Sequence, residues 1–229
     1  MHLEKPVREV FAGVFRVNEK LSTRSLAPGI KVYGEDLNRK KDCEYRAWDL
    51  FRSKLAGAIQ KGLHELPIKP GGSVLYLGAA SGTTASHVAD IVGEDGIVYC
   101  VEMSPRTVRD LVRACEVRPN MVPLLADARF PAQYASAIEE ESEGRVDVIY
   151  QDVADPEQTR IIATNANAFL QKGGAAMLCL KARSIDATVN PQEVFRKTKP
   201  ELEKTFEILQ EINLDPFDKD HLFYNLRKK

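Results

Sequence analysis

Acidic residues stand at the ends of three successive apolar runs in the middle of the chain. Glu102, Asp127 and Asp152 each lie within two residues of such a run, and each run has the length of a strand. Ligands of open parallel sheets bind outside the carboxyl ends of the strands. A carboxylate there suits the ribose hydroxyls of a nucleoside, as we expect of Glu102, or an adenine amino group, as we expect of Asp127. The three acids therefore predict a nucleoside site.

A glycine-rich turn precedes these acids and joins a strand to a helix. It reads Gly78-Ala79-Ala80-Ser81-Gly82-Thr83-Thr84, which offers free N–H groups and small side chains at a helix N-terminus. The spacing is not that of the G-x-G-x-x-G dinucleotide fingerprint, and the lysine of a phosphate-binding loop is absent. Tight packing alone is the plainer alternative. Together with the acids, however, the turn predicts a nucleoside cofactor without phosphates, and the positively charged S-adenosylmethionine (SAM) fits this description.

The elements that must position these residues alternate between strands and helices from residue 70 onward. Such alternation predicts an α/β fold, with a parallel sheet covered by helices on both faces. The expected strands are 74–77, 97–101, 122–125, 146–150 and 175–180, and the expected helices are 86–92, 106–117, 134–141 and 159–170.

The end of the chain has the pattern of a strand hairpin. We expect a strand over 206–214, a turn at Asp215-Pro216 and a last strand over 222–226. This hairpin would place one antiparallel strand at an end of an otherwise parallel sheet. Pro200 is expected to break or kink the helix over 192–204, because proline cannot donate a backbone hydrogen bond.

The beginning of the chain differs from the rest. Short β-like runs over 10–17 and 30–33 are separated by turn residues, which predicts a small antiparallel β domain over residues 1–48. So few residues can hardly bury a core alone, and the unit should pack on a second domain over 49–229. That domain is expected to begin with a helix over 49–63, with Phe51 on its apolar stripe and Lys54 at the border of the stripe.

Composition narrows the class of protein. The 229 residues include Lys+Arg 32 and Asp+Glu 33, a net charge of -1. A protein that grips long RNA or DNA unaided neutralises about 6–10 phosphates and carries a visible excess of basic residues. No apolar run is long enough to span a membrane, and Met1–Pro6 has no apolar signal segment, so we expect a cytoplasmic protein without membrane contact. The scattered cysteines form no C-x-x-C pair, which indicates free thiols and no metal site.

Several longer motifs, spread over essentially the whole chain, closely resemble the fibrillarin family. They are Glu44-Tyr45-Arg46-Ala47-Trp48, Phe51-Arg52-Ser53-Lys54-Leu55, residues 75–84 with Ser86-His87-Val88, Asp152-Val153-Ala154 with Pro156 and Gln158-Thr159, residues 178–186, and Lys219-Asp220-His221.

The resemblance implies a Rossmann-like SAM-dependent methyltransferase fold of the archaeal type, since the Gly/Arg-rich tail of eukaryotic members is absent. It implies an RNA 2'-O-methyltransferase, the catalytic subunit of a box C/D guide ribonucleoprotein that acts on rRNA and, as a second substrate class, on tRNA. The implied partners are the guide RNA, the target RNA, a Nop-type scaffold protein and a kink-turn-binding ribosomal-type protein.

The resemblance also assigns site residues. The family's catalytic set, Lys-Asp-Lys-His, falls on Lys54, Asp152, Lys181 and His221. The residues expected to hold SAM are Gly78, Ala79, Ser81, Thr83, Thr84, Glu102, Met103, Asp127, Ala128, Asp152, Val153, Ala154 and Asp155. Two of them depart from the family pattern. Asp155 stands where a glutamine is usual and adds a negative charge, and Met103 replaces a usual phenylalanine near the adenine.

The four catalytic-set residues have expected roles. Asp152 would orient Lys181 and the ribose 2'-hydroxyl, Lys54 would contact the backbone of the target nucleotide, and His221 would position the ribose. Lys181 is the candidate general base, yet a free lysine has a pKa near 10.4. Because neighbouring cations lower the pKa of a lysine and a carboxylate raises it, two roles stay open: Lys181 takes the proton, or it stays charged and orients the hydroxyl. The plainer alternatives are a boundary lysine at position 54, a turn histidine at 221 and a helix cap at 152.

Three other functions compete with this one. A small-molecule O-methyltransferase usually has elements that close over its substrate, whereas this chain adds only the small β domain. A stand-alone RNA methyltransferase needs its own phosphate-binding surface, which the net charge disfavours. A scaffold subunit without activity would not need an intact Lys-Asp-Lys-His set.

Overall fold

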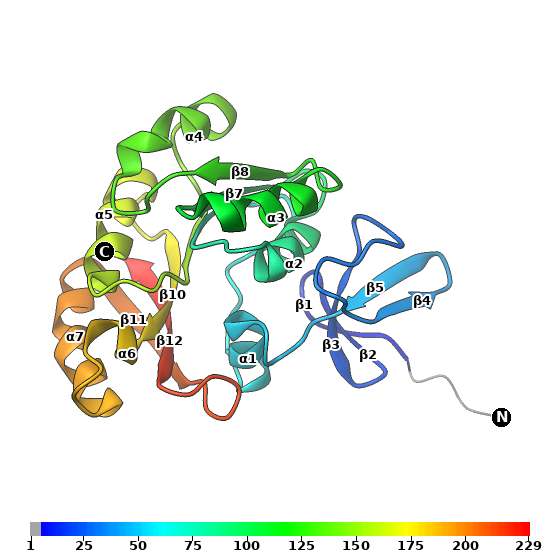
Figure 1. Ribbon diagram of the computed structural model, residues 1–229. Helices are drawn as coiled ribbons and strands as arrows, with labels where there is room; N and C mark the ends of the chain where they lie inside the picture. Colours follow the sequence, from blue (N-terminus) through cyan, green and yellow to red (C-terminus); the bar gives the residue numbers. More distant parts are fainter. Residues whose placement is uncertain (1–5) are drawn as a thin grey trace.

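Residues 6–229 of the computed structural model are described below, and they form two sheets (Figure 1). The first is a five-stranded sheet in the order β1-β2-β3-β5-β4, with every neighbouring pair antiparallel. Its strands are β1 (Arg8–Phe11), β2 (Val14–Val17), β3 (Lys20–Arg24), β4 (Leu37–Lys40) and β5 (Cys43–Ala47). The start of the predicted β domain, residues 1–5, lies outside the described residues, and the boundary at residue 48 stays a prediction.

The strand expected over 30–33 is wrong, because this segment is a loop. The carboxylate of Glu35 accepts hydrogen bonds from the backbone N–H groups of Val32 at 3.1 Å and of Tyr33 at 2.9 Å. These local bonds satisfy the donors that a strand would offer to its neighbour. The segment therefore turns instead of joining the sheet.

The second sheet, in the same described part of the chain, has seven strands in the order β11-β12-β10-β9-β6-β7-β8. The strands are β6 (Ser73–Leu77), β7 (Ile97–Glu102), β8 (Met121–Leu125), β9 (Val148–Gln151), β10 (Ala175–Lys181), β11 (Phe206–Asn213) and β12 (His221–Lys228). Strands β6 to β10 pair in parallel, and β12 is antiparallel to both β10 and β11. The mostly parallel sheet with one antiparallel strand is confirmed. That strand is second from the edge rather than at the end, since β11 forms the edge.

The helices follow the predicted alternation with shifted ends. They are α1 (Lys54–Gln60), α2 (Thr83–Val92), α3 (Pro105–Cys115), α4 (Ala135–Ser142), α5 (Gln158–Phe169), α6 (Ala182–Ile185) and α7 (Pro191–Thr205), with a short 3-10 turn at Pro131–Gln133. Helix α6 was not expected, and α7 continues past Pro200 without a break. Among residues 6–229, no helix is both long and apolar enough to cross a membrane.

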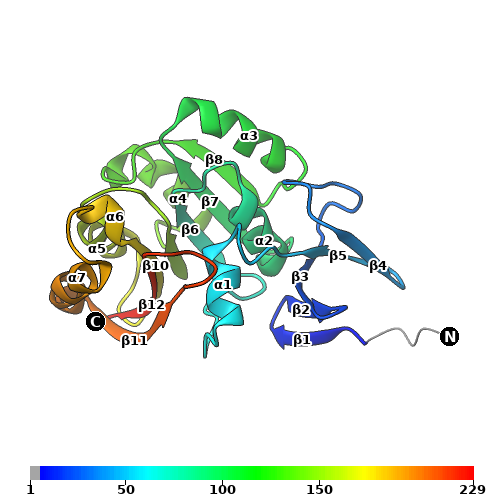
Figure 2. The same cartoon turned by 60° about the horizontal axis from the view of Figure 1, so that its bottom comes forward.

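Side-chain alternation along the central strands divides the core into two layers. In β6, Val74 and Tyr76 point into the layer that contains α1 and α2, whereas Leu75 and Leu77 point into the layer that contains α5 and α7. Side chains of the N-terminal sheet and of Trp48 join the first layer. The expectation that the N-terminal unit packs on the rest of the chain is therefore confirmed, and α1 lies between the two sheets in both views (Figures 1 and 2).

A buried group of charges ties the N-terminal sheet to α2. Arg46 of β5 is fully buried, and its guanidinium lies 2.7 Å from the carboxylate of Glu35 and 2.6 Å from that of Asp90 in α2. Asp90 also pairs with Nε of Arg118 at 3.3 Å. Two cations and two anions thus compensate one another away from water, as buried charges must.

His87 of α2 extends this polar contact. Its two ring nitrogens lie 2.7 Å from Oγ1 of Thr23 and 2.7 Å from the hydroxyl of Tyr33, and Trp48 stacks on the ring with centroids 4.8 Å apart. Burial, together with the guanidinium groups of Arg46 and Arg118, lowers the pKa of His87 well below its ordinary value. The ring is therefore neutral at neutral pH.

Candidate active site

The glycine-rich turn lies where the sheet changes direction. Strand β6 has β7 on one side and β9 on the other, so the chain leaves β6 in one direction and later returns on the opposite side. Such switch points open a crevice at the carboxyl ends of the strands. Gly78 has φ +82°, and a Cβ on it would lie 2.7 Å from the carbonyl oxygen of Asp152. Only glycine lets the turn approach the end of β9 this closely.

Asp152 follows β9 and holds two lysines from distant segments. Nζ of Lys181, the last residue of β10, lies 2.9 Å from Oδ1 of Asp152 and donates to the backbone carbonyl of the same residue at 3.1 Å. Nζ of Lys54 lies 3.2 Å from Oδ2. The three side chains are only 15–19% exposed. The structure thus brings three of the four catalytic-set residues together beside the glycine-rich turn.

Helix α1 places Lys54 at its first turn. The Ser53 hydroxyl accepts a hydrogen bond from the N–H of Ala56 at 3.3 Å and caps the helix. The expected helix over 49–63 was too long, because Asp49 accepts a hydrogen bond from the N–H of Phe51 at 2.8 Å and forms a turn there. Phe51 is consequently not on an apolar stripe. It is 69% exposed and meets Phe217 edge-on, with ring centroids 5.3 Å apart.

His221 begins β12 and lies opposite Lys181 in the antiparallel register. Its Nδ1 lies 2.8 Å from Oδ1 of Asp218, and Oδ2 of Asp218 lies 3.3 Å from Nζ of Lys54. The fourth residue of the set is therefore connected to the others through Asp218, to which the sequence analysis gave no role. Its only signal was a position three residues before the histidine.

Electrostatics keep Lys54 charged and Asp218 ionised. Burial would lower the pKa of Lys54, but the carboxylates of Asp152 and Asp218 outweigh it and raise that pKa. Burial would raise the pKa of Asp218, but the hydrogen bond to His221 and the charge of Lys54 outweigh it and lower that pKa. The site is an alternation of ammonium and carboxylate groups.

The two other strand-tip acids lie on the same edge of the sheet. Glu102, at the end of β7, accepts hydrogen bonds from the N–H of Ala80 in the glycine-rich turn at 3.0 Å and from the N–H of Ser104 at 2.8 Å. Asp127 follows β8 and binds Arg129, with Nη2 2.6 Å from Oδ2. The hydrogen bond from Arg129 lowers the pKa of Asp127.

Arg129 also reaches toward Asp155, with 4.0 Å between Nη1 and Oδ2. One guanidinium thus stands between two acids of the predicted cofactor site and offsets the negative charge that Asp155 adds. This arginine was not among the predicted site residues, because its spacing from Asp127 forms no recognisable motif. Asp155 itself accepts a hydrogen bond from the N–H of Glu157 at 2.7 Å, just before α5.

The remaining predicted cofactor residues differ in their positions relative to the glycine-rich turn. Thr84 is turned toward α1, since its hydroxyl donates to that of Ser53 at 3.0 Å. The carbonyl of Ala128 accepts from the side chain of Asn165 at 2.8 Å, and Val153 packs on the second core layer. The positions on or beside the turn are Gly78, Ala79, Ser81 and Thr83, and Met103 and Ala154 are exposed at the neighbouring strand tips.

Gln158, at the start of α5, is a third residue without a predicted role. Its Oε1 accepts from the N–H of Lys181 at 2.9 Å, and its Nε2 donates to the carbonyl of Lys181 at 3.1 Å. Nε2 of Gln151 in turn donates to the carbonyl of Gln158 at 2.8 Å. This amide pair fixes the backbone at Lys181, and so the direction in which its side chain leaves β10.

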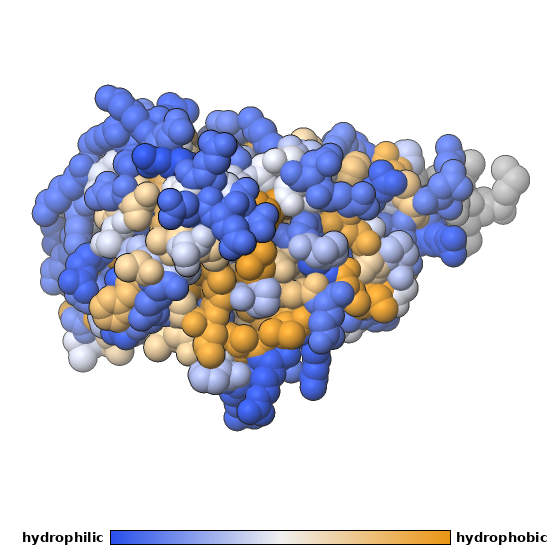
Figure 3. Space-filling model, turned by 90° about the horizontal axis from the view of Figure 1, so that it is seen from above, coloured by the Kyte–Doolittle hydropathy of each residue, from blue (hydrophilic) through white to orange (hydrophobic). Residues whose placement is uncertain are grey.

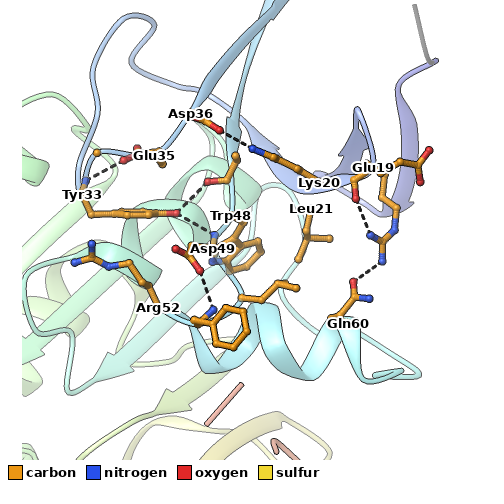
Figure 4. Close-up of a pocket in the computed structure, with 15 residues that line it drawn as sticks. Glu19, Lys20, Leu21, Tyr33, Glu35, Asp36, Trp48, Asp49, Arg52 and Gln60 are labelled. Carbon is orange, nitrogen blue, oxygen red and sulfur yellow. Dashed lines mark hydrogen bonds and ion pairs between the residues drawn. The ribbon is translucent and has the colours of Figure 1, made fainter. Parts of the chain in front are cut away.

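A pocket of about 580 Å³ lies between the N-terminal sheet and α1, beside the start of the helix (Figure 4). Arg16 and Gln60 hydrogen bond across it at 2.7 Å, and Arg52 lies over the ring of Tyr33 at 5.3 Å. Phe51 also lines this pocket. Both apolar and charged side chains line this pocket, and none of the residues of the glycine-rich turn does.

The sheet order, the glycine-rich turn and the lysine–aspartate cluster define the class of Rossmann-like methyltransferase folds. Comparison with known proteins specifies the family. The fibrillarin family model matches residues 4–229, and the chain therefore belongs to the fibrillarin family.

Individual relatives agree with this assignment. A fibrillarin-like rRNA/tRNA 2'-O-methyltransferase of Pyrococcus furiosus is 48% identical over 223 residues, which is 95% of this chain and 96% of the relative. A fibrillarin of Aeropyrum pernix, solved in complex with natively bound S-adenosyl-L-methionine, has a TM-score of 0.87 and 44% identity, covering 99% of this chain and 100% of that one. A chain of a fibrillarin/Nop5p complex has a TM-score of 0.88 and 40% identity, covering 97% and 100%.

Proposed function

We propose that this chain is a SAM-dependent RNA 2'-O-methyltransferase and the catalytic subunit of a box C/D guide ribonucleoprotein. One observation carries the proposal: Lys54, Asp152 and Lys181 converge beside the glycine-rich turn of a fibrillarin-family fold. The Pyrococcus furiosus relative is named as an rRNA/tRNA 2'-O-methyltransferase, which supports both RNA classes as substrates.

The residues around the turn fit SAM. When bound, SAM supplies an electrophilic methyl group on a sulfonium. The turn carries no lysine or arginine that would repel this cation, the carboxylate of Glu102 accepts a hydrogen bond from it, and the backbone of Asp152 lies against it. Glu102 would bind the ribose hydroxyls and Asp127 the adenine amino group, with Arg129 holding Asp127 in place. Backbone N–H groups of the turn would bind further polar atoms.

Lys181 and Asp152 would act on the RNA hydroxyl. Nζ of Lys181 already donates to the Asp152 carbonyl and pairs with its carboxylate, and an ammonium has three donors. The third can orient the ribose oxygen. As that oxygen bonds to the methyl carbon and the C–S bond of SAM breaks, the hydroxyl proton would pass to Nε2 of His221. We therefore assign Lys181 the orienting role, while Lys54 would contact the backbone of the target nucleotide. Holding the hydroxyl in line with the methyl group can supply about 7–11 kcal/mol of the barrier.

RNA selection would be delegated to partners. With a net charge of -1, the chain lacks the basic excess of a protein that finds RNA alone. A guide RNA would choose the target by base pairing, with a Nop-type scaffold and a kink-turn-binding ribosomal-type protein holding the assembly together in the cytoplasm. The solved complex of a related fibrillarin with Nop5p supports the scaffold partner.

We place the scaffold contact at the pocket between the N-terminal sheet and α1. Phe51 is 69% exposed at its rim, and exposed apolar groups mark interaction sites. The face of the molecule seen from above also has hydrophobic residues gathered in one part of a mostly hydrophilic surface (Figure 3).

The variant Phe51→Glu tests this contact by calorimetric titration with a Nop-type scaffold. We expect at least a tenfold loss of affinity, about 1.4 kcal/mol, because a charge would be buried against an apolar partner. Phe130→Glu, at another exposed phenylalanine (54% exposed), is the matched control and should bind normally. Equal affinities of both variants for the scaffold would show that the scaffold contact is not at Phe51.

The function itself is tested by transfer of a labelled methyl group from SAM to a guide-matched RNA. The chain is assayed alone and with guide RNA and both partner proteins. We expect transfer only in the full mixture, and Lys181→Ala should lower it by about 10²-fold or more, because the hydroxyl loses its orienting group, while SAM still binds. Robust transfer by the chain alone would instead support a self-sufficient RNA methyltransferase.

A further inference from the structure

Asp218 lies between two members of the Lys-Asp-Lys-His set. It belongs to the loop between β11 and β12, and its two carboxylate oxygens have different partners. Oδ1 lies 2.8 Å from Nδ1 of His221, and Oδ2 lies 3.3 Å from Nζ of Lys54. One carboxylate therefore connects a residue of α1 with the first residue of β12, 167 positions further along the chain (221 − 54).

The surroundings of Nδ1 fix the tautomer of His221. Besides the Asp218 carboxylate, the backbone carbonyl of Lys219 lies 2.7 Å from Nδ1. Neither a carbonyl nor a carboxylate can donate a hydrogen bond, so Nδ1 must carry the hydrogen. In the neutral ring the lone pair is then on Nε2, the nitrogen that can accept a hydrogen bond from a hydroxyl.

The charged groups form one chain. In order they are Lys181, Asp152, Lys54, Asp218 and His221, and neighbours are separated by 2.9, 3.2, 3.3 and 2.8 Å. Without Asp218, Lys54 would keep the Asp152 carboxylate alone, and the imidazole would keep only the Lys219 carbonyl. The network would then be divided between the lysine cluster and the histidine.

We propose that Asp218 is a positioning residue for methyl transfer, which holds His221 as the Nδ1–H tautomer and keeps Lys54 between two carboxylates. The inference rests on the proposed function and deepens it. Asp218 acts through His221 and Lys54 rather than on the RNA. In this tautomer the imidazole presents Nε2 to the ribose 2'-hydroxyl.

Asp215, Lys219 and Asp220 line the same pocket as His221, and two charged neighbours of the imidazole have partners of their own. Lys181 is its register partner on β10 and is paired with Asp152. Asp220 pairs with Arg183, with Nε 2.9 Å from Oδ2, and so is outside the network. Asp220→Asn therefore removes the same charge two positions away from Asp218 and is the matched control.

The test compares Asp218→Asn, Asp218→Glu and Asp220→Asn in the full ribonucleoprotein. We expect Asp218→Asn to lower the single-turnover rate about 10–100-fold, within the contribution of an acid–base group, with SAM affinity unchanged. Asp218→Glu should restore most of the rate, and Asp220→Asn should behave like the wild type.

A readout without activity separates this inference from the proposed function. Nitrogen NMR of His221 in the free chain should show the Nδ1–H tautomer in the wild type and a smaller share of it in Asp218→Ala, where the Lys219 carbonyl is the acceptor that Nδ1 keeps. The same share of that tautomer in both proteins would overturn the inference, as would a wild-type rate in Asp218→Asn. If the wild-type assembly transfers no methyl group at all, the proposed function fails, and the NMR comparison still decides the role of Asp218.

Discussion

At the scale of single residues, the site depends on one carboxylate that serves two lysines and on one glycine that lets a turn approach it. Asp152 lies within 3.2 Å of Nζ of both Lys54 and Lys181. Its backbone is packed against Gly78, so that the cofactor turn and the catalytic set are in direct contact. A change at this glycine should therefore affect both.

The variant Gly78→Ala tests that contact. A Cβ would lie 2.7 Å from the Asp152 carbonyl oxygen at φ +82°, and we expect a loss of stability of about 2–4 kcal/mol with SAM affinity lowered about tenfold or more. Gly71→Ala is the control, because it has φ +77° but nothing within 4 Å of the added Cβ. It should lose about 1 kcal/mol and bind SAM normally. Equal effects of the two changes on SAM binding, measured by calorimetry, would contradict this account.

The residue types that carry chemistry were accessible from the sequence, whereas their connections were not. Acids at strand tips and the glycine-rich turn have a spacing that fixes their place in a parallel sheet. Asp218 and Arg129 have no such spacing, and their roles depend on contacts with Lys54 and Asp127 that only folding creates. Gln158 was part of a recognised motif, but its bonds to the Lys181 backbone are visible only in three dimensions.

At the scale of elements, the start of α1 decides where Lys54 lies. Periodicity alone extended this helix back to residue 49 and put Phe51 in the core. The cap at Ser53 and the turn at Asp49 override the periodicity and begin the helix at Lys54. Local hydrogen bonds likewise turned the segment at 30–33 away from the sheet. The central strands were predicted nearly to the residue, since long buried runs leave few alternatives.

The variant Ser53→Ala separates the helix cap from the chemistry. Losing the cap should cost about 1 kcal/mol, and the rate of methyl transfer should fall several-fold because Lys54 is the first residue of the helix. Asn190→Ala removes a comparable cap from α7, where the side chain accepts from the N–H of Gln192 at 2.9 Å. Denaturant unfolding should give a larger loss for Ser53→Ala, which also leaves the buried Thr84 hydroxyl without its acceptor, and methyl transfer should be normal only for Asn190→Ala. A normal rate in Ser53→Ala would show that the cap does not position Lys54.

At the scale of the whole molecule, the N-terminal sheet and the seven-stranded sheet share one core layer and one buried polar network. The sequence predicted that the N-terminal unit would pack on the rest of the chain. It did not predict that a fully buried Arg46 and a neutral His87 would connect the two. Removing one partner of a buried ion pair typically costs about 3–5 kcal/mol, so the network makes the two sheets mutually dependent.

Stability should therefore fall in mild acid. The pKa of His87 is well below its ordinary value of 6.5, because of burial and the charges of Arg46 and Arg118. Below about pH 6.5, His87 takes up a proton in the unfolded chain but not in the folded chain. The free energy of unfolding therefore falls by up to about 1.4 kcal/mol for each pH unit. The pKa of Glu35 is lowered from 4.5, so its stabilising contribution is present above that pH and is lost only under more acidic conditions.

Urea unfolding between pH 7 and pH 5 measures this slope. We expect the wild type to lose stability steadily below about pH 6.5, and His87→Gln to be less stable but to lack that contribution to the slope. A free energy of unfolding that stays constant in the wild type over this range would contradict a neutral, buried His87.

The central claim is that this chain methylates the ribose of a nucleotide that another molecule selects. The most direct measurement assembles the chain with SAM, both partner proteins and one of two guide RNAs. The pairing regions of the two guides are shifted by one nucleotide relative to each other along the same target RNA, and the position of the 2'-O-methyl group on that target is then mapped. The account predicts that the modification moves by one nucleotide with the guide and is absent without it. A modification that stays at one position, or that forms without a guide, would contradict it.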